Sequence, residues 1–234
     1  MTEAVFRYVP RIWPFYTTRI RYTFTMFVAT AAICLGQLMS GSVNLSVSAG
    51  GKKVGSAQVS YRITNSGTKL NQTKMEISAD AAKMTIVQES EYAADGTPIR
   101  SFLRTAVFAS GKNSTETVTM LFANGAADVK IEKLGKVETR KITPQSGSEI
   151  RRKDEFWFLT SKPAVGQTFV CRHFDPNTLT WSQLSSKYIG VEQLTVGKGN
   201  VKAHHIKTNR YDYWLDDAGA PLMLKSSAFI MVRE

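Results

Sequence analysis

Residues 83–107 read KMTIVQESEYAADGTPIRSFLRTAV, and their pattern indicates the fold class. Apolar and polar residues alternate on both sides of a central Asp-Gly pair, which supplies the positive φ that a tight turn needs. A period of two residues places one side chain in the core and the next in water. The stretch therefore predicts a β-hairpin, whose apolar face is formed by Met84, Ile86, Ile99, Leu103 and Val107.

The same alternation continues along the chain from Lys52 onward. Val129 and Ile131 alternate with charged residues, and turn pairs such as Asn124-Gly125 separate successive segments. A parallel sheet would show continuous apolar runs, so the pattern indicates an antiparallel sheet with one wet face. Roughly ten such segments predict a mainly β fold, a large curved antiparallel sheet that forms an unclosed barrel or half-barrel.

One segment departs from this pattern. Residues 148–159 contain few β-branched side chains, carry mixed charge and begin with a serine that is suited to cap a helix. We expect one short helix here, between the strands of 52–143 and those of 166–234. A helix in this position can cover the concave side of a bent sheet.

The first 49 residues predict an export signal or an N-terminal membrane anchor. Four arginines, the last of them Arg21, precede the uncharged apolar stretch 24–39. A basic region, then an apolar one, then small residues is the pattern of an export signal, and the basic flank stays in the cytoplasm. Small residues suited to cleavage lie at 40–42 and 47–49. If neither site is cut, about 18 apolar residues are enough to span a bilayer once.

Residues 50–234 are expected to form a single β-rich extracytoplasmic domain, which is periplasmic or extracellular after export. The 234-residue chain is 43% hydrophobic and 21% charged, so it can bury a core and is not of the disordered class. One of its two cysteines lies in the apolar stretch, so the domain cannot depend on an internal disulfide.

The chain is basic, with 30 Lys and Arg against 19 Asp and Glu and a formal net charge of +11. This balance favours an anionic partner. The basic residues of the exported part are scattered over many segments, which is typical of a wet sheet face, so no nucleic-acid partner is expected. Arg151, Arg152 and Lys153 form the one cluster, which is either a contact for an anionic membrane surface or a plain solvated face.

The sequence shows no pattern of a catalytic or metal site. Cys171 and His173 would share one face of a strand, whereas the adjacent His204 and His205 point to opposite faces. This set is short of a structural zinc shell, and the carboxylates around Asp217 are typical of a turn. We therefore expect no catalytic residue, no metal and no cofactor, and predict that the protein is not an enzyme.

Large aromatic residues are the best candidates for a binding site. A curved sheet closed by a short helix can leave an apolar cavity suited to an acyl chain. Large aromatics also fill solid cores, and that alternative stays open. The candidate ligand-binding residues are Phe156, Trp157, Phe169, Trp181 and Trp214.

Three segments resemble hairpins of uncharacterised bacterial envelope proteins that are similar to the LolA/LolB/LppX group of half-barrels. They are 53–61 (KVGSAQVSY), 91–98 (EYAADGTP) and 211–224 (YDYWLDDAGAPLML). The resemblance covers 53–232 as an order of elements. It implies an unclosed β-barrel with helical cover and, from the better-known relatives, carriage of lipid or lipoprotein acyl chains. This chain offers one helix candidate where those carriers place more.

The function expected from the sequence is non-enzymatic binding outside the cytoplasm. The ligand would be lipid-like or otherwise hydrophobic. The alternative is a structural or protein-interaction module of the cell envelope, with a solid core and no small-molecule ligand. A carrier retains hydrophobic ligand through purification, and a solid module does not.

The arrangement of the N-terminal segment predicts that its positive charge directs export. Reversing the charge of Arg19 and Arg21 should impair translocation of a reporter fused after Glu234, because the basic flank holds the N-terminus inside. A wild-type fusion that stays wholly in the cytoplasm would contradict this prediction.

Overall fold

The fold is mainly β and consists of one large antiparallel sheet. It is described from a computed structural model, which covers residues 41–234 except 80–81, 96, 125, 144–161 and 176–178. The described residues form fourteen strands in the order β8-β7-β6-β5-β4-β3-β2-β1-β14-β13-β12-β11-β10-β9. The strands are β1 Gly41–Ala49, β2 Lys52–Ile63, β3 Lys69–Ala79, β4 Ala82–Tyr92, β5 Pro98–Ala109, β6 Lys112–Ala123, β7 Ala126–Lys133, β8 Lys136–Ile142, β9 Thr168–Asp175, β10 Thr180–Val196, β11 Gly199–Thr208, β12 Asp212–Leu215, β13 Pro221–Lys225 and β14 Ile230–Arg233.

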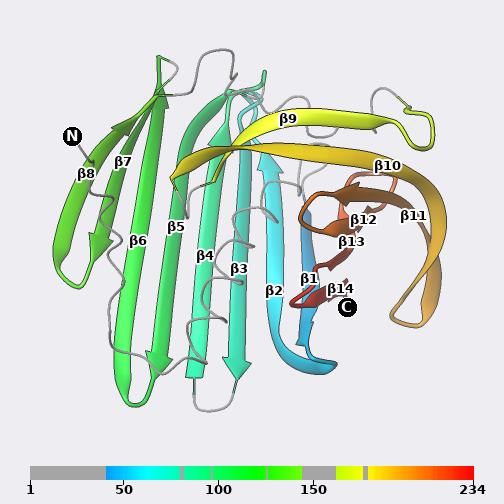
Figure 1. The fold of residues 1–234 in the computed structure, drawn as a ribbon, viewed down its shortest axis with the longest axis horizontal. Helices are drawn as coiled ribbons and strands as arrows, with labels where there is room; N and C mark the ends of the chain where they lie inside the picture. The colour runs from blue at the N-terminus through cyan, green and yellow to red at the C-terminus, as the bar shows by residue number, and fades with distance from the viewer. Residues whose placement is uncertain (1–40, 80–81, 96, 125, 144–161, 176–178) are drawn as a thin grey trace, which may run out of the picture.

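Two meanders build the sheet. Strands β1 to β8 follow one another through hairpins, and so do β9 to β14. Antiparallel pairing of β1 with β14 joins the two runs, while β8 and β9 lie at the two ends of the strand order. The sheet is therefore bent but not closed into a barrel, as the sequence predicts. Figure 1 shows the first run as one wall, with β9 and β10 crossing near one end of its strands.

The hairpins form for the reasons visible in the sequence. Met84 and Ile86 are buried on β4, whereas Lys83, the residue before Met84, is exposed. One face of the strand therefore enters the core. Tight turns use positive φ, as at Asn124 with φ of 51°. The two halves of the predicted hairpin pair as β4 and β5, with Met84 opposite Val107.

The core lies on the inner, concave face of the sheet. Its buried cluster draws residues from both meanders, among them Leu45, Met75, Ile86, Ile206 and Met231. A second, smaller cluster contains Ala203, Trp214 and Leu222. Tyr213 and Leu215 belong to the first cluster, and neighbouring strand residues point to opposite faces, so the Trp214 cluster lies on the outer face.

The prediction that Ile99 belongs to the apolar face is wrong. It is 39% exposed, whereas Leu103 on the same strand is buried. The register shifts here, because Glu91 pairs with Arg100 and Tyr92 pairs with Pro98. Ile99 is thus the extra residue of a β-bulge, which turns its side chain out of the regular alternation.

The sheet begins before the domain boundary predicted between residues 49 and 50. Residues Gly41–Ala49 form β1, which pairs with β2 and β14, and Leu45 and Val47 are buried in the core. Cleavage after Ala49 would remove a strand from the middle of the sheet. The apolar stretch 24–39 and the predicted helix at 148–159 lie outside the described residues. In the described ranges no helix meets the length and hydropathy needed to cross a membrane.

Gly55 generates a test of the sheet's register. It is paired with Val47 on β1 and Ile77 on β3, and a Cβ at this position would lie 1.9 Å from the Glu76 carbonyl oxygen. Because the obstacle is backbone, Gly55→Ala should lower the free energy of unfolding by about 1–3 kcal/mol or more, measured by urea unfolding. The exposed Ser56→Ala is the matched control and should be close to neutral. A stable Gly55→Ala protein would contradict this β2–β3 geometry.

Candidate functional site

A polar patch interrupts the apolar inner face of the sheet. Asn71 on β3 pairs with Ser90 on β4, which pairs with Ser101 on β5. Thr73 pairs with Gln88 in the adjoining inward row. All five side chains are buried. We call Asn71, Thr73, Gln88, Ser90 and Ser101 the inner polar patch.

Two atoms of the inner polar patch are buried without a partner. Within the described part of the chain, neither Asn71 Oδ1 nor Thr73 Oγ1 has a hydrogen-bond partner, although the residues are only 6% and 1% exposed. An unsatisfied buried polar group costs about 1–3 kcal/mol, so such groups call for a ligand or an ordered water. Asn71 Oδ1 accepts hydrogen bonds, and the threonine hydroxyl accepts or donates them.

Apolar side chains surround the patch and continue beyond the buried core. Met75 and Ile86 occupy the next inward row, and both are fully buried. Towards β8 the inner face becomes less enclosed, because Phe122, Ile131 and Ile142 pack against the core but are only partly buried. The concave wall thus combines a polar patch with an apolar surface that is not fully covered.

An ion pair holds the end of β14 near this wall. Arg233 Nη2 donates to Asp216 Oδ2 at 2.9 Å, and the other carboxylate oxygen accepts the backbone N–H groups of Ala218 and Ala220. Burial raises the pKa of Tyr61, and the nearby charge of Asp216 raises it further. Tyr61 lies directly opposite Asn71 in the register, so it borders the inner polar patch in its neutral form.

Two histidines stand on opposite faces of β11. His204 contacts the Tyr188 hydroxyl through Nδ1 at 2.9 Å and Asp217 Oδ1 through Nε2 at 2.9 Å. A hydroxyl, an imidazole and a carboxylate joined by hydrogen bonds can transfer protons. Such a chain is catalytic only if one of its end groups can reach a substrate. Tyr188 is only 7% exposed, and burial raises its pKa. We therefore interpret the Tyr188–His204–Asp217 hydrogen bonds as a structural link between β10 and the turn after β12.

His205 lies in the outer cluster. Its ring stacks on Trp214 with the centroids 4.2 Å apart, Nε2 lies 3.1 Å from Asp212 Oδ1, and Nδ1 lies 3.2 Å from Glu192 Oε1. Trp214 Nε1 donates to the same Glu192 oxygen. These contacts connect β10, β11 and β12 on the outer face. In the ranges that the structure describes, no group of three or more His, Cys, Asp or Glu could hold a metal ion.

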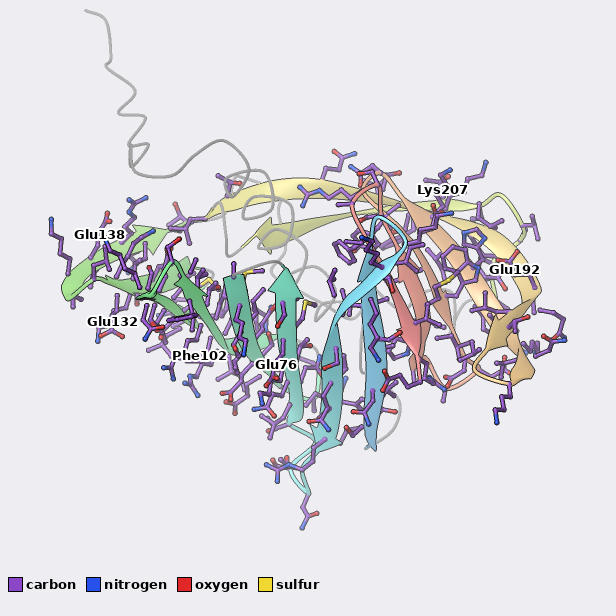
Figure 2. All side chains as sticks on the ribbon, turned by 90° about the horizontal axis from the view of Figure 1, so that it is seen from below. Glu76, Phe102, Glu132, Glu138, Glu192 and Lys207 are labelled. Carbon is purple, nitrogen blue, oxygen red and sulfur yellow. The ribbon has the colours of Figure 1, made fainter. Side chains whose placement is uncertain are left out.

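A groove of 390 Å³ lies across β2 to β5. Most of its lining residues are at outward positions, including Arg62, Gln72 and Arg100. Gln72 Nε2 donates to Glu89 Oε1 at 2.9 Å, and the Arg100 guanidinium lies 5.8 Å from the Phe102 ring centroid. Figure 2 shows Phe102 with Glu76 and Glu132 on the side of the sheet away from β9 and β10. The groove thus lies mainly on the outer face, and its lining also includes Tyr61, Asn71 and Ser90, so it adjoins the inner polar patch.

The predicted ligand-binding aromatics do not gather at one place. Phe169 packs against the main inner cluster, whereas Trp214 belongs to the outer cluster. Trp181 is in β10, but its side chain lies outside the described part. Two other candidates and the basic cluster also lie outside the described residues, namely Phe156, Trp157, Arg151, Arg152 and Lys153. Phe169 and Trp214 therefore do not line a shared pocket.

Sequence reasoning missed the inner polar patch. Its signal is a polar residue at an inward position, such as Gln88 two places after Ile86 or Ser101 two places before Leu103. Alternation alone assigns these residues to the buried face. Their assembly into one patch depends on the register of β3, β4 and β5.

The sequence matches no family model and no curated protein. Among solved structures, the chain is similar to a beta-barrel-like protein of a domain of unknown function, DUF1849, from Brucella abortus. The TM-score is 0.58 at 10% identity, and the match covers 85% of this chain and 96% of that chain. This likeness shows a shared fold, which is compatible with a barrel or half-barrel group.

A substitution at Asp217 tests the hydrogen-bonded chain of Tyr188, His204 and Asp217. Hydrogen bonds from Lys202 and then His204 lower the pKa of Asp217, so the ionised carboxylate stabilises the fold above its unfolded pKa. Because this carboxylate is exposed, Asp217→Asn should reduce the free energy of unfolding at pH 7 by less than about 1 kcal/mol. The difference should disappear as the pH falls through the folded pKa.

Urea unfolding at pH 7 and at pH 2, far below the ordinary pKa of an aspartate, measures this difference. Lys202→Gln is the control background, in which Asp217→Asn should cost less. An equal effect of Asp217→Asn at both pH values would show that the substitution acts through the turn and not through its charge.

Proposed function

We propose that the protein is a non-enzymatic extracytoplasmic binding protein for a lipid-like or other hydrophobic ligand, held on the concave face of the sheet. The observation that carries the proposal is the apolar inner wall at Phe122, Ile131 and Ile142, which remains partly exposed. Burying such surface against an acyl chain gains about 25 cal/mol per Å². The open strand order leaves β8 and β9 at separate ends, so the wall is not enclosed by a complete barrel.

The proposal extends to the compartment and the neighbours. Export through the N-terminal segment would place the sheet in the periplasm or outside the cell. The chain has 30 Lys and Arg against 19 Asp and Glu, and most of this basic excess lies beyond the N-terminal segment, which suits an anionic membrane surface. We relate the protein to the LolA/LolB/LppX half-barrels on the order of its elements. The half-barrel fold is compatible with that relation, and fold alone assigns no ligand.

The second candidate function is a structural or protein-interaction module. It is favoured by the many buried side chains of the inner cluster, which fill much of the concave face. A module of this kind would not retain an acyl chain. Native mass spectrometry of the purified protein separates the two candidates, because only a carrier should show a bound hydrophobic mass.

Neighbouring residues on β6 supply a matched test of the binding face. Phe122 points inward, whereas Leu121 points outward and is 53% exposed. Phe122→Gln should weaken binding of a fluorescent fatty-chain probe about tenfold, the effect of losing about 1.4 kcal/mol of apolar contact. Leu121→Gln should bind like the wild type. Equal affinity of the two variants, or no probe binding by the wild-type protein, would refute the proposal.

A further inference from the structure

We infer that the free edge of β8 pairs with β8 of a second copy of this chain, antiparallel and with Thr139 on the twofold axis. The sheets of the two copies would then continue into one another across this seam. The inference goes beyond the proposed function, because it concerns the pairing of strands and involves no ligand.

Strand β8 has a neighbouring strand on one side only. Among the described residues the strand order ends at β8, with β7 beside it. Six of the seven residues of β8 are exposed, and the apolar Val137 is 59% exposed. Figure 2 shows Glu138 at the end of the sheet remote from Glu192 and Lys207. The described part of the chain therefore leaves this edge open to another strand.

The edge is regular enough to accept a partner strand. Natural sheets commonly protect an edge with a proline, a bulge or a very short strand, or with charged side chains. Strand β8 contains no proline, and it pairs with β7 from Lys133–Lys136 to Ala127–Ile142 without a shift of register. Charge is the device that remains. The order of the charges along β8 therefore decides which strand it can accept.

The hairpin before β8 determines which backbone groups face outward. Leu134 and Gly135 form a two-residue turn with φ of 50° and 76°, and Lys133 pairs with Lys136 across it. The pair that flanks such a turn is hydrogen-bonded, and the hydrogen-bonded positions then alternate along the strand. Positions 136, 138, 140 and 142 thus bond to β7. The N–H and C=O groups that point to the free edge belong to Val137, Thr139 and Lys141.

Backbone pairing and charge together select one register. Outward-facing groups must pair with outward-facing groups, so a twofold axis passes through a residue of β8 and not between two residues. An axis at Glu138 would set two glutamates opposite each other, and an axis at Arg140 would set two arginines opposite each other. Like charges in direct opposition destabilise a strand pair. An axis at Thr139 instead places Glu138 of each copy opposite Arg140 of the other.

Four charges alternate in sign at this seam. Within one chain Arg140 Nε donates to Glu138 Oε1 at 2.5 Å, and this bond holds the pKa of Glu138 below its usual value. The carboxylate is therefore ionised at pH 7. Glu138 and the opposing Arg140 would occupy a non-hydrogen-bonded pair, where side chains of adjacent strands approach most closely. Each carboxylate would lie between two guanidinium groups.

The remaining side chains of β8 also fit this register. Counting from the axis at Thr139 sets Lys141 opposite Val137 and Lys136 opposite Ile142. No two like charges are directly opposed, and each lysine can lay its aliphatic part along an apolar neighbour. The same sequence thus matches itself along the whole length of the edge.

Sedimentation velocity over a concentration series tests the pairing. The wild-type protein should show a monomer–dimer equilibrium. Thr139→Pro should weaken the dimer at least about tenfold, because it removes the N–H group that each copy donates across the axis. That N–H faces away from β7, so the edge strand tolerates the proline and the urea midpoint should stay near the wild-type value.

Two single charge reversals test the pairing without proline. Glu138→Arg makes the edge wholly basic and Arg140→Glu lowers its charge to leave two adjacent acids, so each variant alone should dimerise about three- to tenfold more weakly than the wild type. An equal mixture of the two variants should form a heterodimer, because a basic edge then meets an acidic one at the seam.

Glu76→Arg is the matched control for the charge reversals. Glu76 pairs with Lys74 on its own strand at 2.7 Å, as Glu138 does with Arg140, but β3 lies within the strand order and not at its end. This substitution breaks an equivalent ion pair away from the seam. It should leave the dimer affinity unchanged.

Cysteine substitutions test the register, with the native Cys34 and Cys171 replaced by serine. Thr139→Cys should form an intermolecular disulfide on mild oxidation, because paired Cα atoms at the axis would be about 5.5 Å apart. Val137→Cys is the matched control. The two copies of position 137 would be offset by four residues, or about 14 Å, which is too far for a disulfide.

Each measurement has an outcome that overturns the inference. A wild-type protein that stays monomeric up to about 1 mM has no such seam. A dimer that neither Thr139→Pro nor the charge reversals weaken uses another surface. If the two charge variants fail to form a heterodimer, or if Val137→Cys crosslinks as well as Thr139→Cys, the Thr139 register is wrong. The probe measurements on Phe122→Gln decide the proposed function separately from all of these results.

Discussion

The pairing of β1 with β14 joins the two meanders into one sheet. Leu45 pairs with Arg233 and Val47 with Met231, so the first and last described strands lie side by side in the middle of the sheet. A hydrogen bond from the Glu234 backbone N–H to the Asn44 carbonyl, 3.0 Å long, extends this pairing. Because both meanders end at this seam, a single core can draw on residues from each of them.

The seam also determines what the concave face contains. It brings the Arg233–Asp216 ion pair close enough for Asp216 to raise the pKa of Tyr61, which is the β2 neighbour of Asn71. The inner polar patch thus sits between apolar rows and the neutral Tyr61, towards one end of β3, β4 and β5. Buried polar atoms left without partners oppose folding, so their presence in the core is better explained by a ligand or water than by stability.

An irregularity in β10 brings apolar side chains of that strand into the outer cluster. Tyr188 pairs with Ile206 and Gly190 with His205, so Ile189 is an extra residue in the ladder. Even-numbered residues face the inner core before this bulge, as Tyr188 does, and the outer cluster after it, as Leu194 does. The outer cluster around Trp214 thereby gains its own packing surface. Period-two alternation along β10 does not predict such a change of face.

Local sequence patterns were enough to predict the fold class, the antiparallel pairing and most inward positions, because side chains alternate with a period of two and Asp-Gly or Asn-Gly pairs specify turns. Met84, Ile86, Leu103 and Val129 are buried as this alternation predicts. The three-dimensional structure was needed to show that 41–49 is a central strand, that Phe169 and Trp214 lie in different clusters, and that five inward polar residues form one patch. Those outcomes depend on the register between strands and on bulges. Register arises from contacts between residues distant in the chain, which local periodicity does not encode.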